Sequence, residues 1–215
     1  MQDGGRRTNK ERSETTRTAL LEAARRLFIE HSYAGTGTPE LVAAAEVTRG
    51  ALYHHFADKQ ALFRAVVEAE SQAVAEEIER AAPEDLPPID ALVQGGEAFL
   101  AAMASPGRTR LLLIDAPAVL GRRELDAIDA LHGGRTLREG VAAAMRVNAL
   151  RSLPLDATAQ LLGAAYDRAA LAIEGGADPA EWRVVLKALL DGLATPRHRP
   201  DRHPRARPGA ADVEP

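Results

Sequence analysis

The chain has 215 residues, a formal charge of −4, 46% hydrophobic residues and 27% charged residues. These proportions exclude a wholly disordered chain. No apolar run approaches the roughly 20 residues of a membrane-spanning helix, so we expect no membrane partner. Cysteine is absent, which excludes disulfides, thiolate metal sites and a cysteine nucleophile, and a reducing cytoplasm is the expected location.

The charge is distributed unevenly along the chain. Residues 1–64 carry a net charge of +2, residues 65–150 carry −6, residues 151–195 carry −2 and residues 196–215 carry +2. Because DNA is a polyanion, an end of the chain is a better candidate for DNA binding than its acidic middle.

The first third of the sequence predicts four helices. Apolar residues at three- and four-residue spacing predict a helix over 14–31, and a loop follows at 32–37. The Thr38 side chain is expected to cap a short helix and the Thr48 side chain a second one. The Asp58 side chain is expected to cap a longer helix that ends near residue 82.

The rest of the chain also predicts helices. Prolines at 83–88 mark the best internal boundary, and no later segment alternates as a strand would. Asp178 is expected to cap the last helix. The expected helices lie at 89–104, 107–114, 117–130, 133–149, 156–173 and 179–193.

The fold class that follows is all-α. We divide the chain into a flexible N-terminal arm at 1–13, a three-helix DNA-binding head at 14–65 and a helical body at 66–195. The remaining segment, 196–215, contains five prolines among arginines and histidines and has no apolar periodicity. It is expected to be a disordered tail.

The segment from Thr38 to Lys59 carries the functional signal. Its two short helices are joined by a tight turn at Glu46 and Val47, which is the arrangement of a helix-turn-helix, and the second helix fits the major groove of B-DNA. The candidate DNA-contact residues are Thr38, Thr48, Arg49, Gly50, Tyr53, His54 and Lys59.

This segment resembles the DNA-binding domain of the TetR/AcrR transcriptional regulators. The resemblance rests on Gly50, Leu52-Tyr53, His55-Phe56 and Lys59 at their spacings, and it covers about residues 14–65. The family usually has glycine where this sequence has Glu46. Glu46 is expected either to adopt the left-handed conformation or to change the turn slightly.

The resemblance implies a homodimer with two DNA-binding heads beneath a ligand-binding, dimerising body. It implies a repressor that binds a palindromic operator on double-stranded DNA and is released by a small-molecule effector. The effector would tilt the helix that follows the head and so change the spacing of the two recognition helices.

Each residue of the head has a specific expected role. Arg49 suits a guanine edge, and Tyr53 and Lys59 are expected to contact phosphates. Thr38 either contacts phosphate or caps its helix, and both roles are compatible. His54 is a DNA-contact candidate, whereas His55 is expected to be wedged between the helices of the head. Neighbouring histidines on a helix diverge by about 100°, so no metal site is expected there.

The body offers weaker signals for a ligand site. Asp115 is expected either to cap a helix before Pro117 or to be a polar anchor in an apolar pocket. Four further residues are expected to line a cavity or else to be ordinary core. They are Phe99, Met103, Met145 and Tyr166. No cofactor is expected.

The last two helices are expected to form the dimer interface by pairing with their copies in a four-helix bundle. The alternative is that their apolar residues form an intramolecular core. The residues concerned are Leu161, Ala165, Ala169, Trp182, Leu186, Leu189, Leu190 and Leu193.

Two other functions compete with a regulator. A helical enzyme is one, but the sequence lacks the nucleophile elbow, the P-loop and the HExxH motif. A helical interaction module whose head no longer binds DNA is the other.

Overall fold

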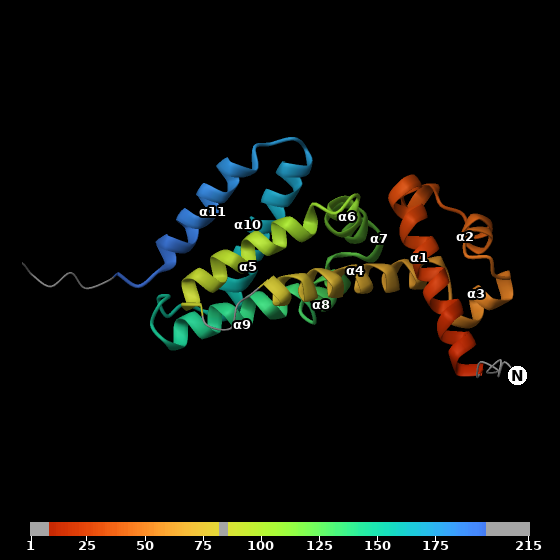
Figure 1. Cartoon of the computed structure of the whole chain (residues 1–215), viewed down its shortest axis with the longest axis horizontal. Helices are drawn as coiled ribbons and strands as arrows, with labels where there is room; N and C mark the ends of the chain where they lie inside the picture. Colours follow the sequence, from red (N-terminus) through yellow and green to blue (C-terminus); the bar gives the residue numbers. More distant parts are fainter. Residues whose placement is uncertain (1–8, 82–85, 197–215) are drawn as a thin grey trace, which may run out of the picture.

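The computed structural model describes residues 9–81 and 86–196, and every regular element in this part of the chain is a helix (Figure 1). The all-α prediction is confirmed for these residues, among which no helix is long and apolar enough to cross a membrane. The elements are α1 (Asn9–Gly35), α2 (Thr38–Ala44), α3 (Arg49–His55), α4 (Lys59–Ala81), α5 (Pro88–Met103), α6 (Arg108–Arg110), the π-helical turn η1 (Leu111–Asp115), α7 (Ala116–Leu120), α8 (Arg122–Asp129), α9 (Gly133–Arg146), α10 (Leu155–Glu174) and α11 (Pro179–Leu193).

Helices α1, α2 and α3 form a head around the first turns of α4. The apolar stripe of α1 is buried as its spacing predicts, with Leu20 and Phe28 fully inaccessible. Phe28, Tyr33 and Phe63 stack in the centre, and the Phe28 and Phe63 ring centroids are 5.1 Å apart. Three aromatic rings at this spacing give a small domain a core that alanine and leucine alone would not fill.

Helix α1 begins earlier than its apolar pattern predicts. Residues 9–13, assigned to the flexible arm, are its first turns, while residues 1–8 lie outside the described part of the chain. These turns have no buried face, so periodicity does not reveal them. Local interactions support them instead: Lys10 lies 4.0 Å from Glu14, and the Thr15 hydroxyl donates to the Glu11 carbonyl.

The predicted caps hold at two of the three sites in the head. The side chains of Thr48 and Asp58 accept hydrogen bonds from amides three residues further on. Helix α2, however, is capped at Gly37 rather than Thr38, and Glu40 accepts from the Gly37 amide at 3.1 Å. Thr38 is therefore the first residue of α2 and not its cap.

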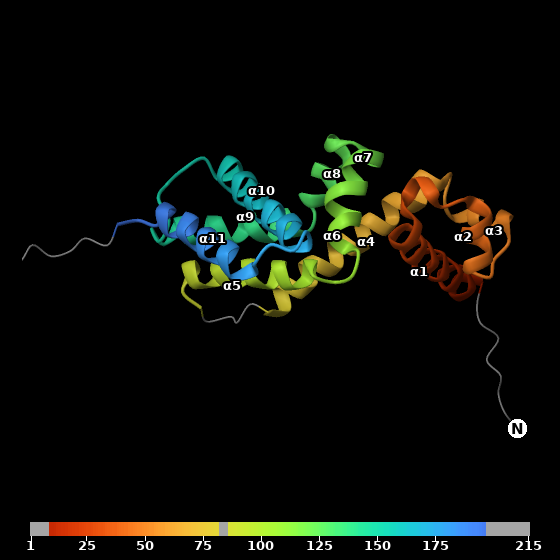
Figure 2. The ribbon, with the colours of Figure 1, turned by 90° about the horizontal axis from the view of Figure 1, so that it is seen from above.

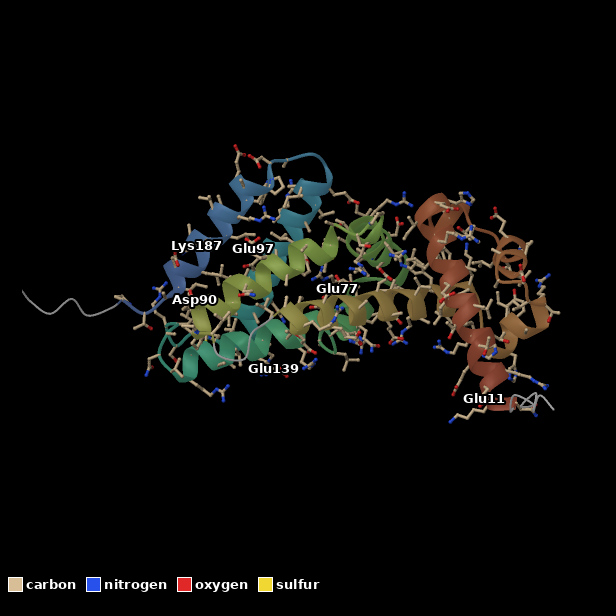
Figure 3. All side chains as sticks on the ribbon, in the orientation of Figure 1. Glu11, Glu77, Asp90, Glu97, Glu139 and Lys187 are labelled. Carbon is tan, nitrogen blue, oxygen red and sulfur yellow. The ribbon has the colours of Figure 1, made fainter. Side chains whose placement is uncertain are left out.

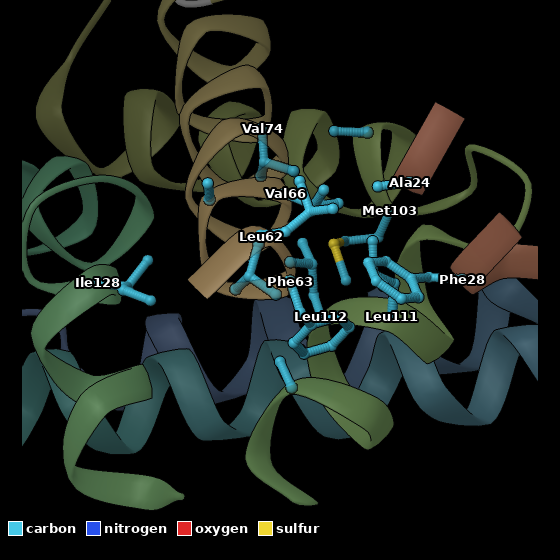
Figure 4. Close-up of a cluster of buried hydrophobic side chains, with 14 of the residues drawn as sticks. Ala24, Phe28, Leu62, Phe63, Val66, Val74, Met103, Leu111, Leu112 and Ile128 are labelled. Atoms are coloured by element: carbon cyan, nitrogen blue, oxygen red, sulfur yellow. The ribbon is translucent and has the colours of Figure 1, made fainter. Parts of the chain in front are cut away.

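Helix α4 connects the head to the body, as Figure 1 shows. Its first half buries Leu62, Phe63 and Val66 in the head, and its second half buries Val74 and Ile78 in the body. The expected domain boundary at residue 65 falls inside this helix. One hydrophobic core runs through both parts, and Figure 4 shows its side chains around Leu62, Phe63 and Met103.

The body packs α5, α9, α10 and α11 side by side and places the short helices α6, α7 and α8 next to the head (Figure 2). The single helix expected at 117–130 is broken at Gly121, whose φ of 80° favours glycine. A second core of Leu92, Val141, Leu162 and Leu190 holds the far end together. The expected tail is outside the described residues from position 197 onward.

Candidate nucleic-acid interface

The turn between α2 and α3 has the geometry of a helix C-cap. Glu46 adopts a φ of 54°, the Glu46 amide donates to the Ala43 carbonyl at 3.2 Å, and the Val47 amide donates to the Val42 carbonyl at 3.0 Å. This pair of bonds defines a Schellman motif, in which glycine is the usual left-handed residue. The first of the two expectations for Glu46 is confirmed, and the turn keeps its shape without glycine.

Helix α3 has one packed face and one open face. Leu52 is buried, and so is Phe56 at its end, where the Arg17 guanidinium lies over the Phe56 ring. The candidate contact residues on its other side all point to solvent. They are Thr48, Arg49, Gly50, Tyr53 and His54.

Arg49, Tyr53 and Thr38 form one polar cluster on the open face. The Arg49 guanidinium carbon lies 5.5 Å from the centroid of the Tyr53 ring. Hydrogen bonds from Arg49 and then from Thr38 lower the pKa of the Tyr53 phenol. The cluster joins the start of α2 to α3, so three candidate contact residues that are separated in sequence share one surface.

Lys59 is engaged in holding the head together. Its ammonium group donates to the Tyr33 carbonyl at 2.9 Å and to the Thr36 carbonyl at 3.0 Å, and it lies 4.1 Å from the Tyr33 ring centroid. An ammonium group has three N–H donors, so one remains for a phosphate. The sequence revealed the position of this lysine but not its role in fixing the loop before α2.

The two histidines at the end of α3 have different surroundings. His54 is exposed, whereas His55 is half-buried between the His54 and Phe56 rings. Burial, followed by the nearby charges of His54 and Arg17, lowers the pKa of His55. The ring contacts of His55 are with its neighbours in the chain, and its expected place between the helices of the head stays a prediction.

The body contains a cavity of about 830 Å³ between α5, α8, α9 and α10. Phe99 and Tyr166 line it, as expected for two of the ligand-site candidates. The other three candidates lie elsewhere. Met103 is buried in the core that the head and body share, and Met145 packs on the far core.

Asp115 fits neither of its two expected roles. Its side chain accepts no helix-capping hydrogen bond, because the π-helical turn η1 runs directly into α7. It pairs instead with Arg110 at 3.4 Å, and Arg110 donates to the Phe28 carbonyl of α1. Asp115 therefore belongs to the junction between head and body.

Two carboxylates of the cavity, Asp129 on α8 and Asp167 on α10, were not candidates in the sequence. Burial and then the nearby Asp129 raise the pKa of Asp167 to about 6. Burial also raises the pKa of Asp129. The sequence offers one indication of this acidic pair. Asp167 is an acid among the small and apolar residues of α10, a stretch that the sequence analysis interprets as part of the dimer interface.

The expected dimer interface divides into an inner and an outer face. Leu186, Leu190 and Ala169 are buried within the single chain, because α11 packs on α5 and α10. Trp182, Leu193 and Ala165 are half-buried. Leu161 and Leu189 are exposed, together with Val184 and Val185, which the sequence did not single out. An apolar stripe alone could not separate these faces, because α11 is apolar on both.

A buried ion-pair network ties the head to the body. Glu70 of α4 accepts from Arg25 of α1 at 2.7 Å and from Arg108 of α6 at 2.9 Å. Arg108 also donates to Glu77 and to the Ala102 carbonyl. Burial alone would raise the pKa of Glu70, but hydrogen bonds from the two arginines hold that pKa below its usual value.

A second set of contacts links α4 to the short helices α7 and α8. Arg64 pairs with Glu124 of α8, and the Gln60 amide donates to the Val119 carbonyl of α7 at 2.9 Å. Helix α8 also lines the cavity through Asp126 and Asp129. One short helix therefore contacts both the cavity and the first turns of α4.

Comparisons with known proteins agree with this architecture. Residues 20–66 match the family described as bacterial regulatory proteins, tetR family, and residues 89–193 match the tetracyclin repressor-like C-terminal domain. A tetR-family transcriptional regulator of Pectobacterium atrosepticum is 31% identical with a TM-score of 0.68, and the alignment covers 89% of this chain and 100% of that one. A structure from Shewanella sp. PV-4, at 22% identity and a TM-score of 0.70, covers 84% and 99% and shares the fold.

The curated relatives match in the head. The transcriptional repressor AcnR of Corynebacterium efficiens is 41% identical over 63 residues, which are 29% of this chain and 34% of that protein. The A-factor receptor protein of Streptomyces griseus is 33% identical over 92 residues, or 43% of this chain and 31% of its own length. The chain spans about a third of the length of the curated relatives it matches.

Proposed function

The chain belongs to the tetR family of bacterial regulatory proteins, and we propose that it represses transcription in the cytoplasm by binding a palindromic operator as a homodimer. We further propose that a small molecule bound in the body releases it from DNA. Because the family is one of regulators, the chain is a transcription regulator rather than an enzyme.

The open face of α3 is the observation that carries this proposal. It presents Arg49, Tyr53 and His54 to solvent, while Leu52 fixes the helix to the head. A helix of this kind fits the major groove, which is roughly 12 Å wide. Figure 3 places the acidic side chains Glu77, Glu97 and Glu139 on the body, away from the head. The body would repel DNA, so binding is confined to the head.

Some residues of the open face recognise the base sequence in this proposal, and others contact phosphates and so set the position of the helix on the DNA. Arg49 reads a base edge, because its planar fork matches guanine O6 and N7. Tyr53, Thr38 and the third donor of Lys59 contact phosphates, which position the helix without reading sequence. Thr48, Gly50 and His54 lie on the same exposed surface and complete the contact.

The outer face of α10 and α11 is our candidate for the dimer contact. Leu161 is 74% exposed and Val184 is 69% exposed. Val185 and Leu189, which are four residues apart and so share one face of α11, are exposed as well. Large apolar side chains gathered on two neighbouring helices are typical of a surface covered by a partner. A second copy that presents the same face would bury them in a four-helix bundle.

Helix α8 is the proposed route from the cavity to the head. A ligand that displaces Asp129 moves α8, whose Glu124 pairs with Arg64 of α4. Five residues earlier on α4, Lys59 holds the Tyr33 and Thr36 carbonyls directly before α2. A tilt of α4 therefore moves the recognition helices away from the spacing of about 34–36 Å at which both half-sites are bound.

The test is a salt titration of DNA binding on an operator selected from genomic fragments and on a scrambled duplex. Arg49→Ala should cost about 1–3 kcal/mol on the operator and relax preference at one base pair per half-site. Tyr53→Phe should weaken both duplexes mildly, without changing the salt dependence. Arg146→Ala, which removes an exposed arginine of α9, is the matched control and should change neither.

Two results would contradict these assignments. Equal weakening of both duplexes by Arg49→Ala would make Arg49 a phosphate contact. If neither Arg49→Ala nor Tyr53→Phe changed binding, α3 would not be the recognition helix.

A further inference from the structure

The cavity of the body has an apolar side and an acidic side. Ile78, Leu92 and Phe99 form the apolar side, and Asp129 and Asp167 lie in the same lining. Its volume of about 830 Å³ is within the range of roughly 300–1,000 Å³ that is usual for small-molecule sites.

The arginines of this lining are already paired. Arg122 lies 2.8 Å from Asp126, Arg138 lies 2.7 Å from Asp156, and Arg135 lies 2.8 Å from Glu79.

The two remaining carboxylates form no ion pair within residues 9–81 and 86–196, and Arg122, the cation that acts on both, is itself paired with Asp126. Asp129 accepts a hydrogen bond from the Gly134 amide at 3.1 Å, and no hydrogen bond or ion pair of Asp167 is present among these residues. The cavity therefore has two carboxylates in excess of its paired charges.

Tyr166 adds an unused polar group to the same cavity. Its side chain is more than nine-tenths buried, yet its hydroxyl forms no hydrogen bond in the described part of the chain. The hydroxyl lies over Gly96, where any side chain would overlap it. Burial raises the pKa of this phenol to about 12, so it stays protonated. No buried side-chain oxygen or nitrogen lacks a hydrogen-bond partner in the described part of the chain, so this hydroxyl is accessible from the cavity and is available to a ligand.

We propose that this cavity binds an organic cation whose ammonium or amidinium group lies between Asp129 and Asp167 and whose apolar portion packs on Phe99 and Leu92. The inference rests on the proposed function, since it gives the chemical class of the effector. The phenol of Tyr166 accepts a further hydrogen bond from the same ligand. A metal ion is a poorer match, because the described residues contain no group of three side chains able to hold one.

The electrostatics of the cavity support the same ligand class. The charged groups that act on Asp129 and Asp167 are Arg122 and Asp126 of α8 and His132 directly before α9, together with the two carboxylates themselves. Mutual repulsion and burial both work against ionisation of the two carboxylates, and the opposite charge of a bound cation favours their ionised form and so offsets both effects. A bound anion would add to the repulsion and is disfavoured.

The test uses three probes with one apolar body and three charges: 4-phenylbutylamine, 4-phenylbutanol and 4-phenylbutyrate. Their binding to the full chain is measured by calorimetric titration near pH 7.5. The amine should bind roughly tenfold or more tightly than the alcohol, because a charge-assisted hydrogen bond is stronger than a neutral one. The butyrate should bind most weakly.

Variants locate the charged contact. Asp167→Asn and Asp129→Asn should each weaken amine binding roughly tenfold and leave alcohol binding unchanged. Asp156→Asn is the matched control, since it removes a cavity carboxylate that is already paired with Arg138. Tyr166→Phe should weaken the amine and the alcohol by similar small factors.

The outcomes separate this inference from the proposed function. No amine binding at millimolar concentration, alcohol binding as tight as amine binding, or equal loss of both in Asp167→Asn overturns the ligand class. The same preparation is tested for operator binding without any probe. DNA binding without amine binding overturns the ligand class alone, and amine binding without DNA binding overturns the repressor proposal alone.

Discussion

Some of the side chains that we propose as DNA contacts also stabilise the fold of the head, and Lys59 is the clearest case. Two of its three donors satisfy the carbonyls of Tyr33 and Thr36. A lysine fixed in this way has already lost much of its rotamer freedom before DNA arrives. The residue that we propose as a phosphate contact is therefore also the one that positions the loop before α2.

Replacing Lys59 by alanine should lower both stability and DNA affinity. Loss of two charge-assisted hydrogen bonds should reduce the free energy of unfolding by about 2–4 kcal/mol. In a dimer, loss of one phosphate contact per head should also reduce the slope of log K against log salt by nearly two, because each contact contributes about −0.9. Thermal melts and salt titrations measure the two effects. Lys10→Ala, at an exposed position of α1, should show neither, and an unchanged melting temperature for Lys59→Ala would contradict the structural role.

Asp167 is a residue whose ionisation opposes folding. Its pKa of about 6 lies above the ordinary value of 3.8, so between these pH values the folded chain binds more protons than the unfolded chain. Stability contributed by this group is therefore lost as pH rises from about 4 to about 6. A carboxylate kept at such a position is typical of a binding site rather than of a core.

Asp167→Asn should therefore stabilise the protein at neutral pH and not in acid. We expect a gain of about 1–3 kcal/mol near pH 7.5, which shrinks toward zero below about pH 4. Urea unfolding at both pH values measures this change in the free energy of unfolding. Asp156→Asn should show no such pattern, and a gain for Asp167→Asn that is equal at both pH values would indicate a packing effect instead.

At the scale of elements, α4 is the axis on which the head and the body are fixed to each other. Glu70 of α4 forms ion pairs with Arg25 of α1 and Arg108 of α6, so three helices meet at one carboxylate. Arg108 is itself 6% exposed. A buried arginine that loses its carboxylate is left with an uncompensated charge.

Glu70→Gln should destabilise the chain strongly, by about 3–5 kcal/mol. Glu77→Gln is the matched control, because Glu77 also pairs with Arg108 but its side chain is 35% exposed, and it should cost about 1 kcal/mol or less. Because the pKa of Glu70 is held below its usual value, its contribution is present above the unfolded pKa and is lost as pH falls through the folded one. Chemical denaturation measures the free energy of unfolding of both variants. Similar losses of stability in the two would show that Glu70 is not the centre of the junction.

At the scale of the whole molecule, Leu189 and Leu190 make it possible to test the fold of the chain and the proposed dimer separately. Leu190 is 1% exposed in the far core, and Leu189 is 47% exposed on the outer face of α11. They are neighbours in the chain but point about 100° apart around the helix. One substitution at each position therefore tests two different surfaces.

Leu190→Asp should unfold the body, because a carboxylate would enter an apolar core at a cost of several kcal/mol. Leu189→Asp should remain helical but sediment as a monomer and lose operator affinity, because a single head contacts one half-site. Val147→Asp, which changes an exposed apolar residue of the chain after α9, should remain a dimer. A folded dimer of Leu189→Asp would move the interface away from the outer face of α11.

The features that the sequence alone determined are those set by neighbouring residues. Helix α3, its Thr48 cap and the buried stripe of α1 depend on interactions within a few positions, so spacing and residue type reveal them. At Glu46 the sequence left two conformations open, and the structure selected the left-handed one. Most of the fold of the head could be predicted from the sequence, because its short helices depend mainly on interactions between neighbouring residues.

Only the tertiary structure decided which distant groups meet. Asp129 and Asp167 lie on separate helices, as do Arg25 and Glu70, and nothing in the local sequence of either pair indicates its partner. The inner and outer faces of α11 are equally apolar in sequence, and packing on α5 selected one of them. These arrangements follow from how whole helices pack against one another, which is a property of long-range contacts and not of periodicity.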